Sequence, residues 1–313
     1  MNTIKNYLSL IKFSHTIFAM PFAMIGFFLG MNVWNHVSFP EISGWHAIIY
    51  PSGIAPDSIP ASGKDLAYRF LLVVLCMVFA RSAAMAFNRY LDRRFDALNP
   101  RTAIREIPKG IITPKNALLF TILNCILFMT AAWFINRICF FLSPVALAVV
   151  LGYSYTKRFT PLCHLILGLG LSLAPIGAYL AVTGAFNWLP ILFSFAVIFW
   201  VSGFDIIYAL QDVDFDQSQE LFSIPAWLGK AKALRVSEFL HLLSAISVIA
   251  AGTLGHFGWI YWIGILVFGG CLIYQHSIVK PNDLRKVNIA FMTTNGIASV
   301  VFALFVIADL LIR

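Results

Sequence analysis

Long apolar runs constrain this chain more than any other feature of its sequence. Nine of them can be drawn, and each is long enough to cross roughly 30 Å of hydrocarbon as a helix. Because backbone polar groups find no water inside a bilayer, runs of this kind span it as α-helices. We therefore expect an all-α polytopic membrane bundle that forms a single domain over residues 1–313. The expected helices cover residues 16–34, 66–87, 117–135, 138–155, 162–182, 189–210, 237–254, 258–275 and 289–311.

Composition excludes a soluble globular protein. Hydrophobic residues make up 60% of the chain and charged residues 12%, against roughly 45–50% and 25% in soluble domains. The net charge of +8 is therefore not taken as a sign of nucleic-acid binding. Five scattered cysteines without a C-x-x-C pair indicate neither a disulfide framework nor a zinc site. No small-residue cleavage pattern follows the first apolar run, so we expect a retained helix rather than a signal peptide.

The distribution of basic residues predicts the orientation. If the N-terminus is cytoplasmic, 17 of the 22 Lys and Arg residues fall on the cytoplasmic side. The positive-inside rule then favours nine helices with the N-terminus inside and the C-terminus outside. We expect a multi-pass protein of a bacterial cytoplasmic (inner) membrane. Residues 37–64 would form an extracytoplasmic loop, and residues 88–115 and 211–236 would form two long cytoplasmic loops.

Two acidic motifs lie in these cytoplasmic loops and the helix ends that lead into them. The first reads Asn88-x-x-x-Asp92-x-x-x-Asp96, and the second reads Asp205-x-x-Tyr208-x-x-x-Asp212-x-x-x-Asp216. A spacing of four places such residues on one stripe of a helix. Adding 120 to each position of the first motif gives Tyr208, Asp212 and Asp216, which suggests two pseudo-symmetric four-helix halves.

The residue types predict a site for a metal ion and a phosphate compound. Four carboxylates at facing helix ends would repel one another strongly unless a cation lay between them. Oxygen ligands favour Mg²⁺, which keeps bound water and takes phosphate oxygens. Several basic residues follow the first motif, and Lys157 and Arg158 end the fourth helix. Such a site beside an apolar bundle suits a diphosphate that carries a long hydrocarbon chain.

At these residues the chain resembles the UbiA superfamily of membrane prenyltransferases. The resemblance rests on NRYLDRRFDALNPRTAIREIPKG from Asn88, DIIYALQDVDFD from Asp205, Tyr153-x-x-x-Lys157-Arg158 and, more weakly, the segment Asn288 to Asn295. It implies helices around a central cavity that opens laterally to lipid. It also implies that Mg²⁺ and a polyprenyl diphosphate are bound by Asn88, Asp92, Asp96, Asp212 and Asp216. Arg94, Arg105, Lys157 and Arg158 become candidates for direct phosphate contacts.

Three residues are catalytic candidates. Asp205 lies two turns before Asp212 and could orient or deprotonate a phenol on the acceptor. Tyr208 precedes Asp212 by one turn. Arg81 lies two turns before Asn88 and could pair with a carboxylate on the acceptor, although a long cationic side chain could equally reach for the membrane surface.

The resemblance implies a Mg²⁺-dependent transfer of a polyprenyl chain to 4-hydroxybenzoate or a similar hydroxylated aromatic acid, in ubiquinone or menaquinone biosynthesis. Enzymes of the 4-hydroxybenzoate branch typically have Asn-Asp where this chain has Asn88-Arg89, and R-P-L-P where it has Arg105 to Pro108. The runs RSAAMAFNR, REIP and YALQDVDFD look more like a sister branch, and some of its members are linked to menaquinone synthesis by the futalosine route. That resemblance implies a dihydroxynaphthoate as the alternative acceptor. An ion or organic-anion transporter is the alternative from another class, because charged groups near helix ends also suit transport.

Overall fold

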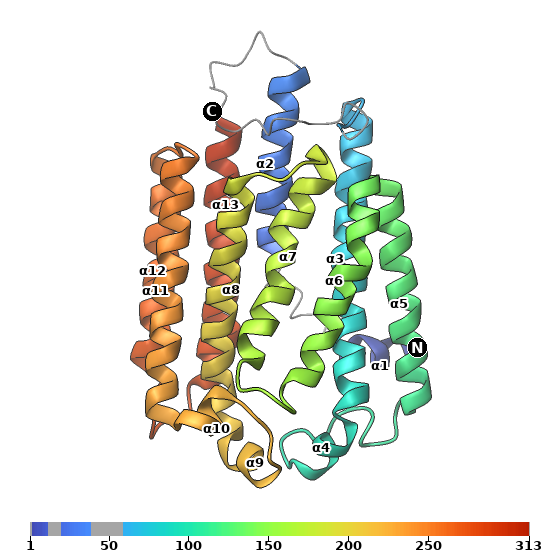
Figure 1. Ribbon diagram of the computed structural model, residues 1–313. Helices are drawn as coiled ribbons and strands as arrows, with labels where there is room; N and C mark the ends of the chain where they lie inside the picture. The colour runs from blue at the N-terminus through green and yellow to red at the C-terminus, as the bar shows by residue number, and fades with distance from the viewer. Residues whose placement is uncertain (1, 12–19, 39–58, 313) are drawn as a thin grey trace.

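The computed structural model describes residues 2–11, 20–38 and 59–312, and these segments are almost entirely helical. Most of the expected extracytoplasmic loop, residues 39–58, lies outside the described residues. The helices run in the following order (Figure 1): α1 (Asn2–Leu10), α2 (Met20–Ser38), α3 (Gly63–Leu91), α4 (Arg93–Leu98), α5 (Pro114–Ile135), α6 (Arg137–Thr156), α7 (Cys163–Thr183), α8 (Trp188–Ala209), η4 (Leu210–Asp212), α9 (Val213–Ser218), α10 (Ile224–Leu228), α11 (Lys230–Leu254), α12 (Trp259–Ile278), η5 (Ile289–Thr294) and α13 (Asn295–Ile312).

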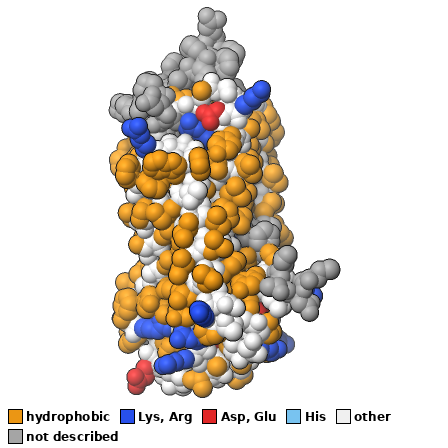
Figure 2. Space-filling model, turned by 90° about the vertical axis from the view of Figure 1, so that its right-hand side faces the viewer, with side chains coloured by type: hydrophobic (Ala, Val, Ile, Leu, Met, Phe, Trp, Pro, Cys, Tyr) orange, Lys and Arg blue, Asp and Glu red, His pale blue; other side chains and the backbone are white. Residues whose placement is uncertain are grey.

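The all-α membrane fold expected from the apolar runs is confirmed. Eight segments of the described chain are long and apolar enough to cross a membrane, and the 19-residue α2 stands among them in the bundle (Figure 1). One face of the molecule shows hydrophobic side chains along its middle, with Lys and Arg near the two ends (Figure 2). The chain is therefore a multi-pass integral membrane protein.

Some element boundaries differ from the expectation. The helix expected to begin at residue 237 begins at Lys230, so the second motif loop is shorter than 211–236. The helix expected over 289–311 opens with a π-helical turn, η5. The short α1 was not expected, because its nine residues are mainly polar on one side and too few to span a bilayer.

Local sequence explains where several helices begin and end. Ser62 caps α3 by accepting a hydrogen bond from the Asp65 N–H. Thr113 caps α5 in the same way and is followed by Pro114, whose fixed φ suits the first helical position. Asn136 caps α6 and also donates from its side chain to Leu180 O on α7 at 2.8 Å. The last helix of this group, α7, ends at Gly184, which takes the left-handed conformation at φ 63°.

Close backbone approach holds the centre of the bundle together. A Cβ on Gly26 would lie 2.0 Å from Pro175 O, so α2 packs against α7 only because that position has no side chain. Gly168 has the same role between α7 and α8, where an added Cβ would lie 2.5 Å from Ile198 O. Small residues at such contacts are how membrane helices gain packing without a hydrophobic driving force. This central contact leaves α3, α5 and α6 to one side of α7 (Figure 1).

The helices repeat with the same offset as the motifs. Adding 120 to the bounds of α3 gives 183–211, which covers α8 at Trp188–Ala209. The same sum places α5 at 234–255 and α6 at 257–276, against α11 at Lys230–Leu254 and α12 at Trp259–Ile278. The short helices α4, α9 and α10 gather at one end of the bundle, and the end of α13 lies at the other (Figure 1). Both motifs therefore reach the same face of the molecule.

Candidate active site

Both acidic motifs break their helix at the middle aspartate. Asp92 follows the last residue of α3 with φ −87° and ψ 5°. Asp212 ends the η4 turn and precedes α9 with φ −106° and ψ 6°. These dihedrals leave the helical region, so the expected unbroken stripes through Asp96 and Asp216 are wrong. The break turns α4 and α9 across the mouth of the bundle and brings the two motifs face to face.

Each of the four aspartates forms an ion pair with one basic side chain. The nitrogen–oxygen distances are 2.8 Å for Arg158–Asp92, 2.6 Å for Arg105–Asp96, 2.6 Å for Arg101–Asp212 and 2.7 Å for Lys157–Asp216. Asp96 and Asp216 are buried, whereas each cation keeps about a fifth to a third of its side chain exposed. The acids therefore form the inner wall of the site and the cations form its accessible side.

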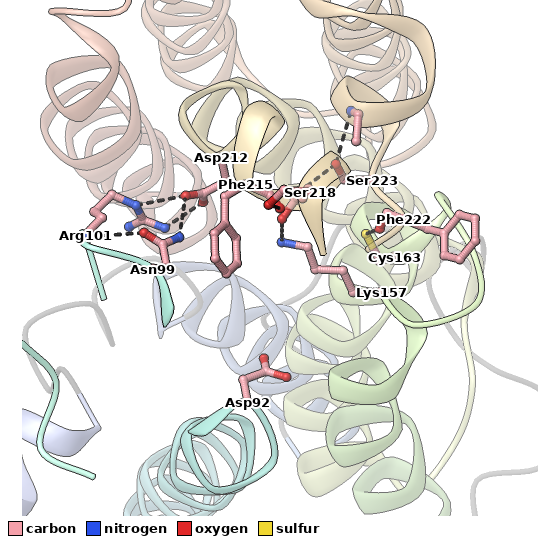
Figure 3. A network of polar contacts seen from close by, with 12 residues as sticks. Asp92, Asn99, Arg101, Lys157, Cys163, Asp212, Phe215, Ser218, Phe222 and Ser223 are labelled. Carbon is pink, nitrogen blue, oxygen red and sulfur yellow. Dashed lines mark hydrogen bonds and ion pairs between the residues drawn. The ribbon is translucent and has the colours of Figure 1, made fainter. Parts of the chain in front are cut away.

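Arg101, which is not among the predicted site residues, joins the two motifs. Its Nε and Nη2 contact the two carboxylate oxygens of Asp212 at 3.0 and 2.6 Å, and its Nη1 donates to Tyr208 Oη at 3.0 Å. Asn99 adds a longer hydrogen bond to Asp212 (Figure 3). Arg101 opens the R-T-x-x-R run from which only Arg105 was chosen, so its position in that run was the available signal.

Two further polar side chains form hydrogen bonds within the site. Asn88 donates to Asp92 Oδ2 at 3.1 Å. Tyr208 stacks on Phe291 of η5 with ring centroids 4.2 Å apart, while its hydroxyl accepts from Arg101. Tyr208 is thus held from both sides at the rim of the site.

Asp205 has a partner on a neighbouring helix that no local sequence pattern indicates. His164 Nδ1 lies 2.6 Å from Asp205 Oδ2, and the His164 side chain is buried on α7. The seven histidines show no ligand spacing in the sequence, and the 41 residues between this pair gave no local signal. Only the packing of α7 on α8 reveals the contact.

Two cavities meet inside the bundle. A polar cavity of about 220 Å³ is bordered by Asn88, all four motif aspartates, Arg101, Arg105, Lys157, Arg158, His164, Asp205 and Tyr208. An apolar cavity of about 360 Å³ lies between α3, α6 and α7, with further residues from α5. Tyr153 and Leu167 border both cavities, so the two spaces share a boundary at these side chains.

Two predicted residues lie elsewhere. Arg94 is exposed on α4 and borders neither cavity. Arg81 borders the apolar cavity, where its Nε is buried without a hydrogen-bond partner. The structure therefore brings together all five predicted metal ligands and three of the four predicted phosphate contacts, together with Asp205 and Tyr208. It places Arg81 on the neighbouring apolar side.

Burial and pairing shift the pKa values of groups at the mouth of the site. Burial raises the pKa of Asp92 to about 6, although the neighbouring Arg158 opposes this shift. Burial alone would lower the pKa of Lys157, but the Asp216 carboxylate raises it above its ordinary value. The pKa of Arg101 is likewise raised by Asp212 and Tyr208 against the effect of burial. Both cations stay charged, and Asp92 protonates at a higher pH than an ordinary aspartate does.

The donor chemistry suits a divalent cation that is shared with a ligand. Asp96 Oδ2 is buried and accepts no hydrogen bond, so this oxygen keeps free lone pairs beside the cavity. Within the described segments, no three His, Cys, Asp or Glu side chains are placed to hold an ion by themselves. Mg²⁺ is commonly held in this way, by one or two carboxylates with water and phosphate completing its shell. The residues present therefore fit Mg²⁺ bound together with a phosphate compound.

In the described part of the chain, an apolar cavity lies beside an acid- and cation-lined polar cavity inside a bundle of membrane-spanning helices. This arrangement suits a lipid that carries a diphosphate. The profile of the UbiA prenyltransferase family matches residues 54–297. The chain belongs to this family and is a membrane prenyltransferase.

Relatives of similar sequence and solved structures agree with this assignment. The 4-hydroxybenzoate octaprenyltransferase of Tolumonas auensis is 30% identical over 250 residues, which cover 78% of this chain and 85% of the relative. The protein of the same name from Aeromonas hydrophila is 30% identical over 251 residues, with 80% and 85% covered. A UbiA homologue from Aeropyrum pernix superimposes with a TM-score of 0.73 at 27% identity, covering 95% and 97% of the two chains. One from Archaeoglobus fulgidus, solved with GPP and Mg²⁺, gives 0.63 at 21% identity over 97% and 99%, which supports the fold.

Proposed function

We propose that this chain is a Mg²⁺-dependent aromatic polyprenyltransferase of respiratory quinone biosynthesis. It would transfer a polyprenyl chain from polyprenyl diphosphate to 4-hydroxybenzoate or a similar hydroxylated aromatic acid. The junction of the two cavities at Tyr153 and Leu167 carries this proposal, because it offers a charged space for a diphosphate beside an apolar space for its tail. The names of the bacterial relatives support an aromatic acceptor.

The basic residues of the polar cavity would bind and stabilise the leaving diphosphate. Arg105, Lys157 and Arg158, with Arg101, keep part of each side chain accessible while one face contacts an aspartate. Positive charge fixed in advance around the leaving group lowers the barrier to breaking the allylic C–O bond. Bound Mg²⁺ would supply further neutralisation of the departing diphosphate. Asn88 and the four motif aspartates are the residues that would hold it.

Other residues would act on the acceptor. Asp205 borders the polar cavity and precedes Asp212 by two helical turns. There it could take the proton of an acceptor hydroxyl. A phenolate makes its ring electron-rich and therefore reactive toward an allylic cation. Arg81 lies on the same side of the junction as the tail and could pair with the acceptor carboxylate. With Tyr208 held by Arg101, these residues enclose the place where ring and allylic carbon would meet.

The acceptor has two candidates of one chemical class. Both 4-hydroxybenzoate and a dihydroxynaphthoate are phenols that carry a carboxylate, so Asp205 and Arg81 would serve either. Arg89 and the Arg105 to Pro108 run motivate the naphthoate alternative, and the relatives' names motivate 4-hydroxybenzoate. A transporter is less consistent with membership of a prenyltransferase family.

The deciding experiment offers purified protein both acceptors with a polyprenyl diphosphate and Mg²⁺, and identifies products by mass spectrometry. We expect one aromatic acid to gain the polyprenyl mass, with no product from Asp212→Asn protein. The matched control is Asp214→Asn, which changes an exposed acid on the same turn of α9. Absence of prenylated product from both acceptors would contradict the proposal, and solute flux in liposomes without prenylation would favour transport.

A further inference from the structure

A buried histidine fixes the carboxylate that faces the acceptor side of the polar cavity. His164 is the second residue of α7 and has 3% of its surface exposed. Its Nδ1 lies 2.6 Å from Asp205 Oδ2 on α8. About a quarter of the Asp205 side chain remains exposed toward the cavity that both residues border. One carboxylate oxygen is thus occupied by His164 while the side chain still reaches the open space.

The surroundings of the ring define which nitrogen carries the proton. His164 Nε2 faces the backbone N–H of Ile224 at 3.4 Å, and a backbone N–H can only donate. Nε2 is therefore the acceptor, and the proton lies on Nδ1, which donates to Asp205. Ser202 Oγ also donates to the His164 carbonyl oxygen at 3.0 Å, which fixes the start of α7 against α8. The ring is held from α7, α8 and α10 in one orientation.

His164 is also the partner that distinguishes Asp205 from the other site acids. Each motif aspartate pairs with a Lys or Arg, whereas among the described residues the short polar contact of Asp205 is with the His164 imidazole. Ile224 follows Ser223, whose hydroxyl donates to Asp216 Oδ2 at 3.0 Å. Because Ser223 and Ile224 are adjacent in the chain, they link the His164 ring to Asp216 on the diphosphate side of the cavity. The single Nδ1–H of His164 engages one oxygen of Asp205, and the other oxygen can accept a proton from the cavity that Asp205 borders.

Building on the proposed function, we propose that His164 is the positioning residue for Asp205 as the base that activates the acceptor hydroxyl. The acceptor O–H bond breaks, its proton bonds to the Asp205 oxygen that His164 does not occupy, and the electron pair stays on the phenolate. The His164 proton remains on Nδ1 throughout and keeps its hydrogen bond to Asp205. No oxidant, reductant or further reactant is needed for this step.

The test compares three substitutions in the full-length protein. His164→Ala should lower kcat by roughly 10- to 100-fold, the range expected when a hydrogen bond to a charged group is removed, with prenyl diphosphate affinity within about twofold of wild type. His164→Asn should recover most of the loss, because its amide N–H can take the place of Nδ1–H. His276→Ala is the matched control, since it removes a half-buried imidazole that contacts His241 and borders neither cavity.

A second measurement separates base chemistry from general damage to the fold. A fluorinated hydroxybenzoate that is already ionised at the assay pH no longer needs a base, so the His164→Ala defect should shrink with this acceptor. In an Asp205→Asn background, His164→Ala should cause little further loss of kcat, because the two residues act as one unit.

Several outcomes would overturn the inference. These are wild-type kcat in His164→Ala, equal losses of turnover and diphosphate affinity, or a defect that is the same with the ionised acceptor. If His164→Ala does not fold, a His164→Asn protein as slow as Asp205→Asn overturns it. Wild-type protein that prenylates no aromatic acid rejects the proposed function as well, whereas active wild type with an unaffected His164 variant rejects the role of His164 alone.

Discussion

At the scale of single residues, the site depends on acids that are costly to bury. Asp92 shows this most directly, because burial raises its pKa to about 6 even beside Arg158. A raised pKa means that the folded protein binds the proton more tightly than the unfolded chain does. The contribution of Asp92 to stability is therefore present below about pH 4 and lost as the pH rises through about 6. The charged form of Asp92 would bind a metal ion, but it is also the form that lowers the stability of the folded protein.

Replacing Asp92 with Asn should separate metal binding from stability. In excess chelator, Asp92→Asn protein should be more stable than wild type at pH 8 by on the order of 2 kcal/mol, and the difference should shrink between about pH 6 and pH 4. Turnover should be lost, because Asn removes a charge that would bind the metal ion. Thermal unfolding in detergent and a prenyl-transfer assay measure the two effects. Unchanged turnover, or undiminished wild-type activity in chelator, would contradict the assigned role of Asp92.

At the scale of elements, the π-helical turn η5 contacts the rim of the site, where its Phe291 packs against Tyr208. Asn295 donates to the carbonyls of Ala290 and Phe291, five and four residues earlier, and so stabilises the wide turn. Its own Oδ1 accepts from Trp200 Nε1 and Gln275 Nε2 at 2.9 and 2.8 Å. The turn sets the position of Phe291, which stacks on Tyr208. π-helical turns of this kind often accompany functional sites.

Asn295→Leu should therefore weaken both the fold and the rim of the site. The substitution leaves Trp200 and Gln275 without a buried acceptor, at a cost of about 1–3 kcal/mol for each unsatisfied group. With η5 relaxed, Tyr208 loses its stacking partner, and we expect weaker binding of polyprenyl diphosphate together with a lower Tm. Ser299→Ala, one turn further along α13, is the control, because its hydroxyl donates within its own helix to Gly296 O. Equal effects of the two substitutions on diphosphate affinity would argue against a role for η5.

At the scale of the whole molecule, the arrangement of the helices sets the membrane topology. The motif helices α4 and α9 lie at one end of the bundle and the end of α13 lies at the other (Figure 1). If the basic residues around the motifs face the cytoplasm, the site opens toward a soluble acceptor from that side. The apolar cavity lies deeper in the bundle, where a lipid tail would remain within the hydrocarbon layer.

Cysteine labelling tests this orientation in intact cells. Ser218→Cys, exposed at the end of α9, should react with a membrane-impermeant maleimide only after the cells are opened. Thr253→Cys, exposed at the opposite end of α11, should react in intact cells. Unsubstituted protein controls for the five native cysteines, which lie in the membrane-spanning helices. The reverse labelling pattern would place the site outside the cytoplasm and contradict the argument from basic residues.

Much of the molecule was accessible from the sequence alone, because its determinants are local. Apolar runs must become helices inside a bilayer, so the number and order of the long helices followed from hydropathy. The spacing of the two motifs identified Asn88, Asp92, Asp96, Asp212 and Asp216, and all five border one cavity. The offset of 120 residues also recurs in the helix boundaries. The residues that determine these features lie close together in the chain, so the spacing and composition of short segments are sufficient to predict them.

Only the tertiary structure decided which of these residues meet. Arg101 reaches Asp212 across 111 residues, and His164 reaches Asp205 from the neighbouring helix. Arg94 shares the motif with Asp92 but faces away from both cavities. The helix breaks at Asp92 and Asp212 are likewise seen only in the folded backbone. Contacts between distant segments depend on how the helices pack in three dimensions. The spacing of residues within one helix does not predict which other helix it will contact.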